Sequence, residues 1–449
     1  MRGVDFRAMA ALHRGIKKHL NEVVQSIPVE PGNQVGFFSS AEFEQFQKLL
    51  LEGEHWRRLL DAYDLFGIVR DRTAHSLQNT IPAEYRGPLG KCRVDGIVAR
   101  VESDLIGYLE SLPRQYAVCF ELPAFQKYGV ARTEVANGVS LIETTIGFDE
   151  ALLEPQNSLL VALGNSSDRL RRNTTYVVFQ SPGFASSSID SFSVATAVAR
   201  VKHFAYLGAA DNRLNIQRGL ADIMFEHRTG VAPPMADAFV YNPSDIAREA
   251  YRLRVPDGLS KYLRQIRMNE KELMIHDGKG ASSALLGRPA ESPAEKIAAM
   301  PHTLFATRPF FDIPDGEMDA ERIRAAIEWY VDSVTTDNHT IAFLQSCIGL
   351  EALLSDDKDK RGGVTNKLCD RLTYLLGRTI SERRELRDNF EKIYDHRGSI
   401  VHGRRARLGA DDTVAMVNAR HMLDRCIRTE VAGLLKAIRL REEAAKNSS

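Results

Sequence analysis

The sequence predicts an α+β protein with mixed helices and short strands in its N-terminal region and an all-α helical bundle at its C-terminus. Two observations support this fold class. Between about residues 115 and 183, short runs rich in β-branched residues are bounded by turn residues, a pattern typical of strands. From Asp319 onward, apolar residues recur at spacings of three and four, a pattern typical of amphipathic helices.

Composition places the chain among soluble globular proteins. Its 449 residues include 59 basic and 59 acidic side chains, with 44% hydrophobic and 26% charged residues. This balance excludes wholesale disorder and a uniformly basic nucleic-acid coat, but it is compatible with one local basic site. The five cysteines are far apart and form no Cys-x-x-Cys motif, which favours a reduced environment without a zinc site. No signal peptide or membrane-spanning run is evident, so we expect a cytoplasmic protein with no membrane partner and no cofactor.

Taken in order, the N-terminal region divides into three parts. Residues 1–112 are predicted to be helical over 1–80, with Ser39-Ser40 as a cap, and again over about 90–112. Residues 113–276 are predicted to carry strands and then a helix from Gly183 to about 230. The expected strands cover four ranges: 116–122, 139–146, 158–163 and 175–179. Asn137-Gly138 is expected to be a turn. Residues 277–316, rich in Gly, Ser, Pro and Ala, are predicted to be a linker.

Residues 317–449 form the predicted bundle. Thr379 and Glu382 have the spacing of a capping box at the start of its fourth helix. Short connections between successive helices favour an up-down arrangement. The five predicted helices cover 319–334, 337–355, 364–376, 380–402 and 411–438.

The fourth predicted helix contains an arginine where its pattern calls for an apolar residue. Arg397 belongs to a stripe with spacings of four, three, four and three that is otherwise apolar. A guanidinium in such a seam requires a carboxylate, a partner chain or an anionic ligand. His402 follows five residues later, before Gly403, which we expect to end the helix. The segment then continues with three further arginines and no acid before Asp411: Arg404, Arg405 and Arg407.

These residue types suit acid–base chemistry at a phosphodiester. Histidine supplies a general acid or base near neutral pH, and a guanidinium stabilises charge on the phosphorane oxygens without a metal. On one helix, a spacing of five separates Arg397 and His402 by about 140°, so they do not face each other. A productive site is therefore expected to combine residues of two chains across a two-fold axis, which predicts a homodimer.

The run Ile-Tyr-Asp-His-Arg-Gly-Ser-Ile-Val-His-Gly at 393–403 resembles the signature helix of the HEPN superfamily, particularly its Apea-like branch. Residues 349–354 resemble the glutamate-bearing helix of that family, and residues 370–376 resemble the helix between them. The resemblance implies a HEPN-like dimeric bundle and, in active members, a metal-independent endoribonuclease of the kind found in phage-defence and toxin systems. It implies Arg397 and His402 as catalytic residues. The expected supporting residues are Glu351, Tyr394, Ser399 and Arg371, and the expected RNA-binding residues are Arg404, Arg405 and Arg407.

Other interpretations remain open. An arginine followed at such a spacing by a histidine occurs four times in the chain, so context carries the assignment. Active family members often have Asn, Asp or His where this chain has Gly398, which favours a catalytically silent dimerisation, RNA-binding or protein-binding module. Arg397 could pair structurally with Glu351, His402 could complement the helix dipole, and Ser399 could bond a backbone carbonyl. Residues 1–316 are expected to sense a protein trigger or present substrate. No motif in 1–318 supports placing the main enzyme there.

Overall fold

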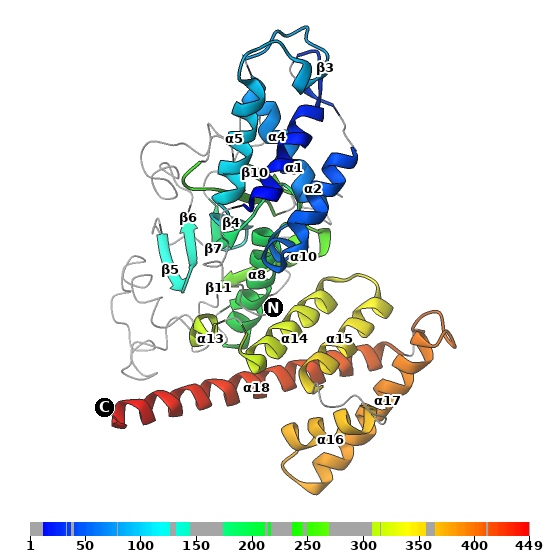
Figure 1. Ribbon diagram of the computed structural model, residues 1–449. Helices are drawn as coiled ribbons and strands as arrows, with labels where there is room; N and C mark the ends of the chain where they lie inside the picture. Colours follow the sequence, from blue (N-terminus) through cyan, green and yellow to red (C-terminus); the bar gives the residue numbers. More distant parts are fainter. Residues whose placement is uncertain are drawn as a thin grey trace, which may run out of the picture.

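The computed structural model describes most of the chain and has an α+β architecture (Figure 1). Within the described ranges, no helix combines the length and the apolar character that a membrane crossing requires. The described ranges are 12–32, 34–36, 40–78, 80–125, 132–143, 174–211, 214–216, 236–245, 249–268, 308–314, 316–355, 364–409 and 412–448.

A helical unit with its own hydrophobic core opens the chain. Its helices are α1 (Arg14–Ser26), α2 (Ala41–Glu52), α3 (Glu54–Leu59), α4 (Ala62–Leu77) and α5 (Ile97–Glu110). The Ser40 hydroxyl accepts a hydrogen bond from the Phe43 N–H at 3.2 Å, so the predicted cap on α2 is confirmed at Ser40. The second predicted helix is also confirmed, although α5 begins at Ile97 and not near residue 90.

The prediction of helix throughout residues 1–80 was wrong between α1 and α2. Two short strands, β1 (Pro28–Glu30) and β2 (Gln34–Val35), pair there with β3 (Gly87–Pro88) in an antiparallel sheet. Proline disfavours helical backbone in the residue before it, and Ile27 has a non-helical ψ of 121°. Pro28 therefore ends α1 and starts an extended segment.

The central layer is an antiparallel sheet of six strands in the order β10-β9-β4-β7-β6-β5. Its long central pair, β4 (Arg114–Leu122) and β7 (Thr175–Gly183), runs in register from Arg114 opposite Gly183 to Leu122 opposite Thr175. The other strands are β5 (Arg132–Ala136), β6 (Val139–Glu143), β9 (Ala238–Tyr241) and β10 (Ala250–Leu253). Strands predicted at 116–122 and 175–179 are found, and the strand predicted at 139–146 is found over 139–143. Residues 144–146 and the strand predicted at 158–163 lie outside the described residues. Asn137-Gly138 joins β5 to β6, with Gly138 at a φ of 62°.

Helix α8 (Phe192–Ala210) packs against β4 and β7. The prediction that it continues to about residue 230 was wrong, because the chain enters a strand, β8 (Leu214–Ile216), which pairs with β11 (Ile266–Met268). The short helix α10 (Asp257–Leu263) precedes β11. Most of the predicted linker lies outside the described residues, but its end is a helix, α13 (Arg308–Asp312), anchored by the buried Phe310.

All five predicted C-terminal helices are confirmed. They are α14 (Met318–Thr335), α15 (His339–Leu354), α16 (Val364–Leu376), α17 (Ile380–Val401) and α18 (Thr413–Ser448). Helix α18 continues ten residues beyond its predicted end. It runs beneath the α14–α15 pair, and α16 and α17 form a second pair beside it (Figure 1).

One hydrophobic core extends from the sheet into these C-terminal helices. Helix α8 joins them through polar contacts as well: Lys202 Nζ lies 2.6 Å from Asp332 Oδ1 of α14. The Tyr206 hydroxyl donates to Asp424 Oδ1 of α18 at 2.8 Å. The sheet and the C-terminal helices therefore support each other, while α16 and α17 lie on the side away from the sheet (Figure 1).

Candidate functional site

Local sequence signals define both ends of α17, the helix that carries the predicted catalytic residues. At its start, the Thr379 hydroxyl accepts from the Glu382 N–H at 3.2 Å, and the Glu382 carboxylate accepts from the Thr379 N–H at 3.2 Å. This confirms the predicted capping box. At its end, His402 is the C-cap residue and Gly403 has a φ of 70°, a conformation that glycine adopts without strain.

Arg397 lies in the seam between α17 and α15 and is paired with Glu351. Its Nη2 lies 3.1 Å from Glu351 Oε1 and 3.3 Å from Oε2, and each side chain is 29% exposed. Within the described residues, Nε and Nη1 of Arg397 have no hydrogen-bond partner. One nitrogen thus satisfies the carboxylate, and the rest of the guanidinium retains donors for a ligand.

Below this pair, the seam is apolar and buried. The Tyr394 ring stacks on Phe390 with centroids 4.3 Å apart and an interplanar angle of 27°. Burial, and then the negative charge of Glu351, raise the pKa of Tyr394 above its ordinary value. Burial likewise raises the pKa of the Cys347 thiol, which lies one turn before Glu351 on α15. Neither group is therefore available as a base near neutral pH, and both form a support beneath the Arg397–Glu351 pair.

His402 is exposed at the end of the helix. Its backbone N–H donates to the Gly398 carbonyl at 3.0 Å, but its ring has no hydrogen-bond or ion-pair partner among the described residues. Arg397 and His402 are thus carried by the same helix end, one half-buried and the other in solvent. No direct contact joins the two side chains within one chain.

The connection from α17 to α18 is organised by Asp412. Its Oδ2 accepts from the Gly409 N–H and from Arg405 Nη1, both at 3.0 Å. Its Oδ1 lies 3.6 Å from His396 Nδ1. The Gly409 hydrogen bond, and then the charges of Arg405 and His396, hold the pKa of Asp412 below its usual range. All three predicted arginines are exposed, but they differ in pairing: Arg405 is paired with Asp412, whereas Arg404 and Arg407 have no ion-pair partner among the described residues.

Two predicted supporting residues bond the backbone instead. The Ser399 hydroxyl donates to the Asp395 carbonyl at 2.8 Å, the bond to the residue four positions earlier that a helical serine commonly makes. Arg371 Nη1 donates to the Leu354 carbonyl at 2.6 Å and ties α16 to the end of α15. The structure thus brings together Arg397, Glu351 and Tyr394, and it places Ser399 and Arg371 in contacts within the fold.

Sequence reasoning missed His396 and Asp412. His396 directly precedes Arg397, and its only sequence signal was its place inside the run at 393–403. Asp412 lies 16 residues further on, so only the folded connection brings it to His396. Together these residues add a titratable group and a carboxylate beside the predicted site.

The described residues contain no group of histidine, cysteine and carboxylate side chains arranged to hold a metal ion. All five cysteines are free, and four of them are buried. Guanidinium, imidazole and carboxylate groups lie at the end of α17.

Exposed apolar side chains surround the same end of α17. The Leu408 N–H donates to the Thr340 hydroxyl at 3.0 Å, which places the connection after α17 against the first turn of α15. Four large apolar residues of the helix ends that meet here are exposed by 48%, 51%, 66% and 53%: Ile341, Val401, Val414 and Val417. Their shared location at these helix ends makes this part of the bundle a candidate contact surface.

No family model, curated protein or solved structure matches the chain.

Proposed function

We propose that the protein is a metal-independent endoribonuclease that acts as a homodimer, with Arg397 and His402 as its catalytic residues. The observation that carries this proposal is the end of α17, where a half-buried guanidinium with unused donors and an exposed imidazole belong to one helix. A phage-defence or toxin role is the biological setting that the sequence resemblance suggests.

In this mechanism, His402 takes the proton of the attacking 2′-hydroxyl or protonates the leaving 5′-oxygen. Arg397 donates from Nε and Nη1 to the phosphorane oxygens, while Glu351 pairs with its Nη2 and fixes the orientation of the guanidinium group. Bond making and breaking yield a 2′,3′-cyclic phosphate and a 5′-hydroxyl. Arg404 and Arg407, both exposed, are placed to attract the RNA backbone.

The same geometry supports the proposed dimer. Because Arg397 and His402 make no contact within one chain, a complete site requires His402 of a second subunit near Arg397 of the first. The exposed apolar group Ile341, Val401, Val414 and Val417 supports a contact between two copies at this end of the bundle.

The test is digestion of RNA in the presence of a chelator. We expect Arg397→Ala and His402→Ala each to lower the cleavage rate by about 10²–10⁴-fold. Matched controls are Arg384→Ala, an exposed arginine on α17, and His421→Ala, an exposed histidine on α18; both should cut like the wild type. Equal cutting by all five proteins would overturn the assignment.

Mixing the two inactive variants tests the composite site. In an equimolar mixture about half of the dimers are mixed, and each carries one intact site of two, so roughly one quarter of the wild-type activity should return. No recovery, with mixed dimers demonstrated by mass spectrometry, would show that both residues act within one chain.

The alternative is a silent module that binds RNA or protein without chemistry. Gly398 favours it, because a polar residue often occupies this position in active members of the resembling family. Wild-type protein that binds RNA and leaves it uncut under every chelated condition, with binding lost in Arg397→Ala, would support this alternative over the nuclease.

A further inference from the structure

A pocket of about 720 Å³ is lined largely by residues of α4. Helix α4 belongs to the N-terminal part of the chain and lies apart from α17 (Figure 1). Its volume is that of a typical small-molecule site. One wall is α4 itself. The others are Tyr108 of α5, the segment 184–188 after β7, and Glu249 and Tyr251 at β10. The pocket therefore lies where the helical unit meets the sheet.

Arg72 forms one pole of this pocket. Its Nη2 lies 3.0 Å from Glu249 Oε1, and its guanidinium lies over the Tyr108 ring, 4.0 Å from the centroid. Its side chain is only 12% exposed, and within the described residues Nε and Nη1 have no hydrogen-bond partner. A buried guanidinium with unused donors facing a cavity is suited to an anionic group.

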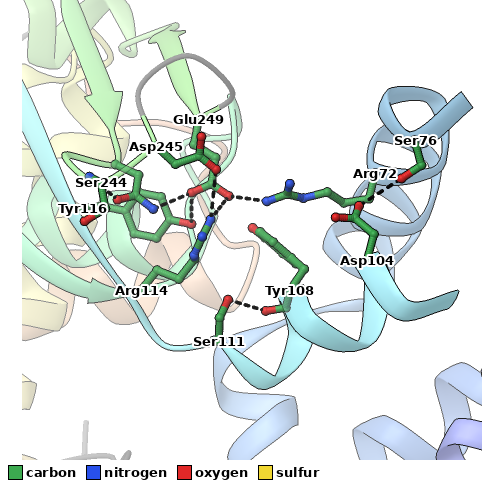
Figure 2. Close-up of polar contacts among 11 residues, drawn as sticks. Arg72, Ser76, Asp104, Tyr108, Ser111, Arg114, Tyr116, Ser244, Asp245 and Glu249 are labelled. Carbon is green, nitrogen blue, oxygen red and sulfur yellow. Dashed lines mark hydrogen bonds and ion pairs between the residues drawn. The ribbon is translucent and has the colours of Figure 1, made fainter. Parts of the chain in front are cut away.

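Glu249 does not neutralise Arg72 alone, because it also serves a second arginine (Figure 2). Arg114 Nη1 forms a short ion pair with Glu249 Oε1, and the Tyr116 hydroxyl donates to Oε2 at 3.2 Å. Asp245, the other acid of this cluster, lies on the Arg114 side, 3.8 Å from Arg114 Nη1. Arg72 therefore shares the Glu249 carboxylate with Arg114 and does not have it to itself.

Asp64 forms the opposite pole. It is 8% exposed, and its carboxylate accepts a hydrogen bond from the Asp61 N–H at 3.3 Å. It has no ion-pair partner among the described residues, and burial together with the charges of Asp61 and Asp190 raises its pKa to about 6. Eight residues of helix separate Asp64 from Arg72, which places the two poles about 12 Å apart along α4.

Aromatic rings and hydroxyls also line the pocket. Phe66, Phe184 and Tyr251 line the pocket, and the serines at 186–188 add polar groups to its rim. A simple anion would meet Asp64 and Asp71, and a simple cation would meet Arg72. The ammonium and carboxylate groups of an α-amino acid are separated by a single carbon atom and cannot reach both poles.

We propose that this pocket binds a nucleotide, with the phosphate on Arg72, an amino edge of the base on Asp64 and the base against the aromatic wall. Purines and pyrimidines offer a planar ring with N–H donors that a carboxylate accepts, and the phosphate lies at the far end of the ribose. This site is independent of the nuclease proposal, because nothing in it involves α17.

Calorimetric titration of the full chain with AMP, GMP, CMP and UMP tests the proposal. We expect at least one mononucleotide to bind once per chain, with its nucleoside and inorganic phosphate each binding at least tenfold more weakly. A 5′-phosphorylated oligonucleotide in a parallel titration distinguishes a free nucleotide from the end of an RNA strand. Failure of all four mononucleotides and of the oligonucleotide to bind the wild type would overturn the proposal.

The variants are chosen to retain the fold. Asp64→Asn keeps an acceptor for the cap, and Tyr63→Ala removes a ring that lines the pocket but is 74% exposed. Asp64→Asn should weaken nucleotide binding at least tenfold, and Tyr63→Ala should weaken it a few-fold. Asp95→Asn and Arg93→Gln, both exposed and outside the pocket, are matched controls. Wild-type affinity in both pocket variants would refute the site. Arg397→Ala protein should bind the nucleotide like the wild type, so failure of this proposal is distinguishable from failure of the nuclease proposal.

Discussion

Glu249 and Asp64 are both buried carboxylates, but they differ in the cations and hydrogen-bond donors that surround them. Glu249 receives two guanidiniums, the Tyr116 hydroxyl and the Asn242 amide, the last at 2.8 Å. Among the described residues, Asp64 accepts only the backbone N–H of its capping box. A buried charge without a cation is costly, and the protein lowers this cost by binding a proton more readily.

This contrast predicts how stability depends on pH. Because the pKa of Asp64 is about 6 in the folded protein and lower in the unfolded chain, the folded state binds this proton more tightly. The contribution of Asp64 is therefore most favourable below pH 4 and is lost as pH rises through 6. Relative to Asp64→Asn, the free energy of unfolding of the wild type should fall by about 1–3 kcal/mol over that interval.

Urea denaturation at pH 4 to 7 measures this difference. Asp95→Asn serves as the control, since Asp95 is exposed and its replacement should leave the difference from the wild type nearly constant with pH. A wild-type curve parallel to that of Asp64→Asn across the whole interval would contradict the raised pKa.

At the scale of elements, two glycines in the C-terminal helices have opposite surroundings. A Cβ at Gly349 in α15 would lie 2.7 Å from Leu423 Cδ2 of α18 and 3.1 Å from Trp329 Cβ of α14. A Cβ at Gly398 in α17 would meet no atom within 4 Å. Gly349 therefore permits close approach of three helices, whereas Gly398 only weakens its own helix.

Alanine substitutions should separate these two roles. Gly349→Ala should lower the free energy of unfolding by about 1–3 kcal/mol through overpacking. Gly398→Ala should raise it by about 0.5–1 kcal/mol through helix propensity. Denaturant unfolding of the two variants beside the wild type provides the comparison, and equal shifts of the same sign would contradict the packing described for α15.

The sequence contains enough information to locate the long helices but not the short strands. Helices α14 to α18 are determined by local periodicity, caps and breakers such as Gly377. Strand β9 has only four residues and pairs with β4, more than 100 positions earlier, so its signal lies in a distant partner. The same difference applies to the sites. The Arg397–Glu351 pair was foreseeable from a charge in an apolar seam, whereas Arg72 and Glu249 meet across 177 positions.

For the whole molecule, the core that begins in the sheet continues through α8 into α14 and α18. The Tyr206 ring packs edge-on against Tyr330, with centroids 5.0 Å apart, and its hydroxyl bonds Asp424. The division at residues 316 and 317 remains a prediction about evolution and function. Physically, the sheet and the C-terminal helices share buried surface, so their local stabilities should be coupled.

Tyr206→Phe tests this coupling. Loss of the hydroxyl bond should cost about 0.5–1.5 kcal/mol, and hydrogen exchange should accelerate in both α8 and α18. Tyr374→Phe is the control, because Tyr374 is 72% exposed on α16 and its replacement should leave both helices unchanged. Faster exchange confined to one of the two helices would show that they open separately.

Helix α18 contacts α14, α8 and the end of α17 through side chains on successive turns, so these contacts depend on one continuous helical register. Arg420 reaches Ser333 of α14, and one turn later Asp424 reaches Tyr206 of α8, while the first turns of α18 border the end of α17. One inserted residue would rotate everything beyond it by about 100° and turn one set of contacts into solvent. To keep the contacts of Arg420 and Asp424 together with those of its first turns, α18 can change length only by near-whole turns.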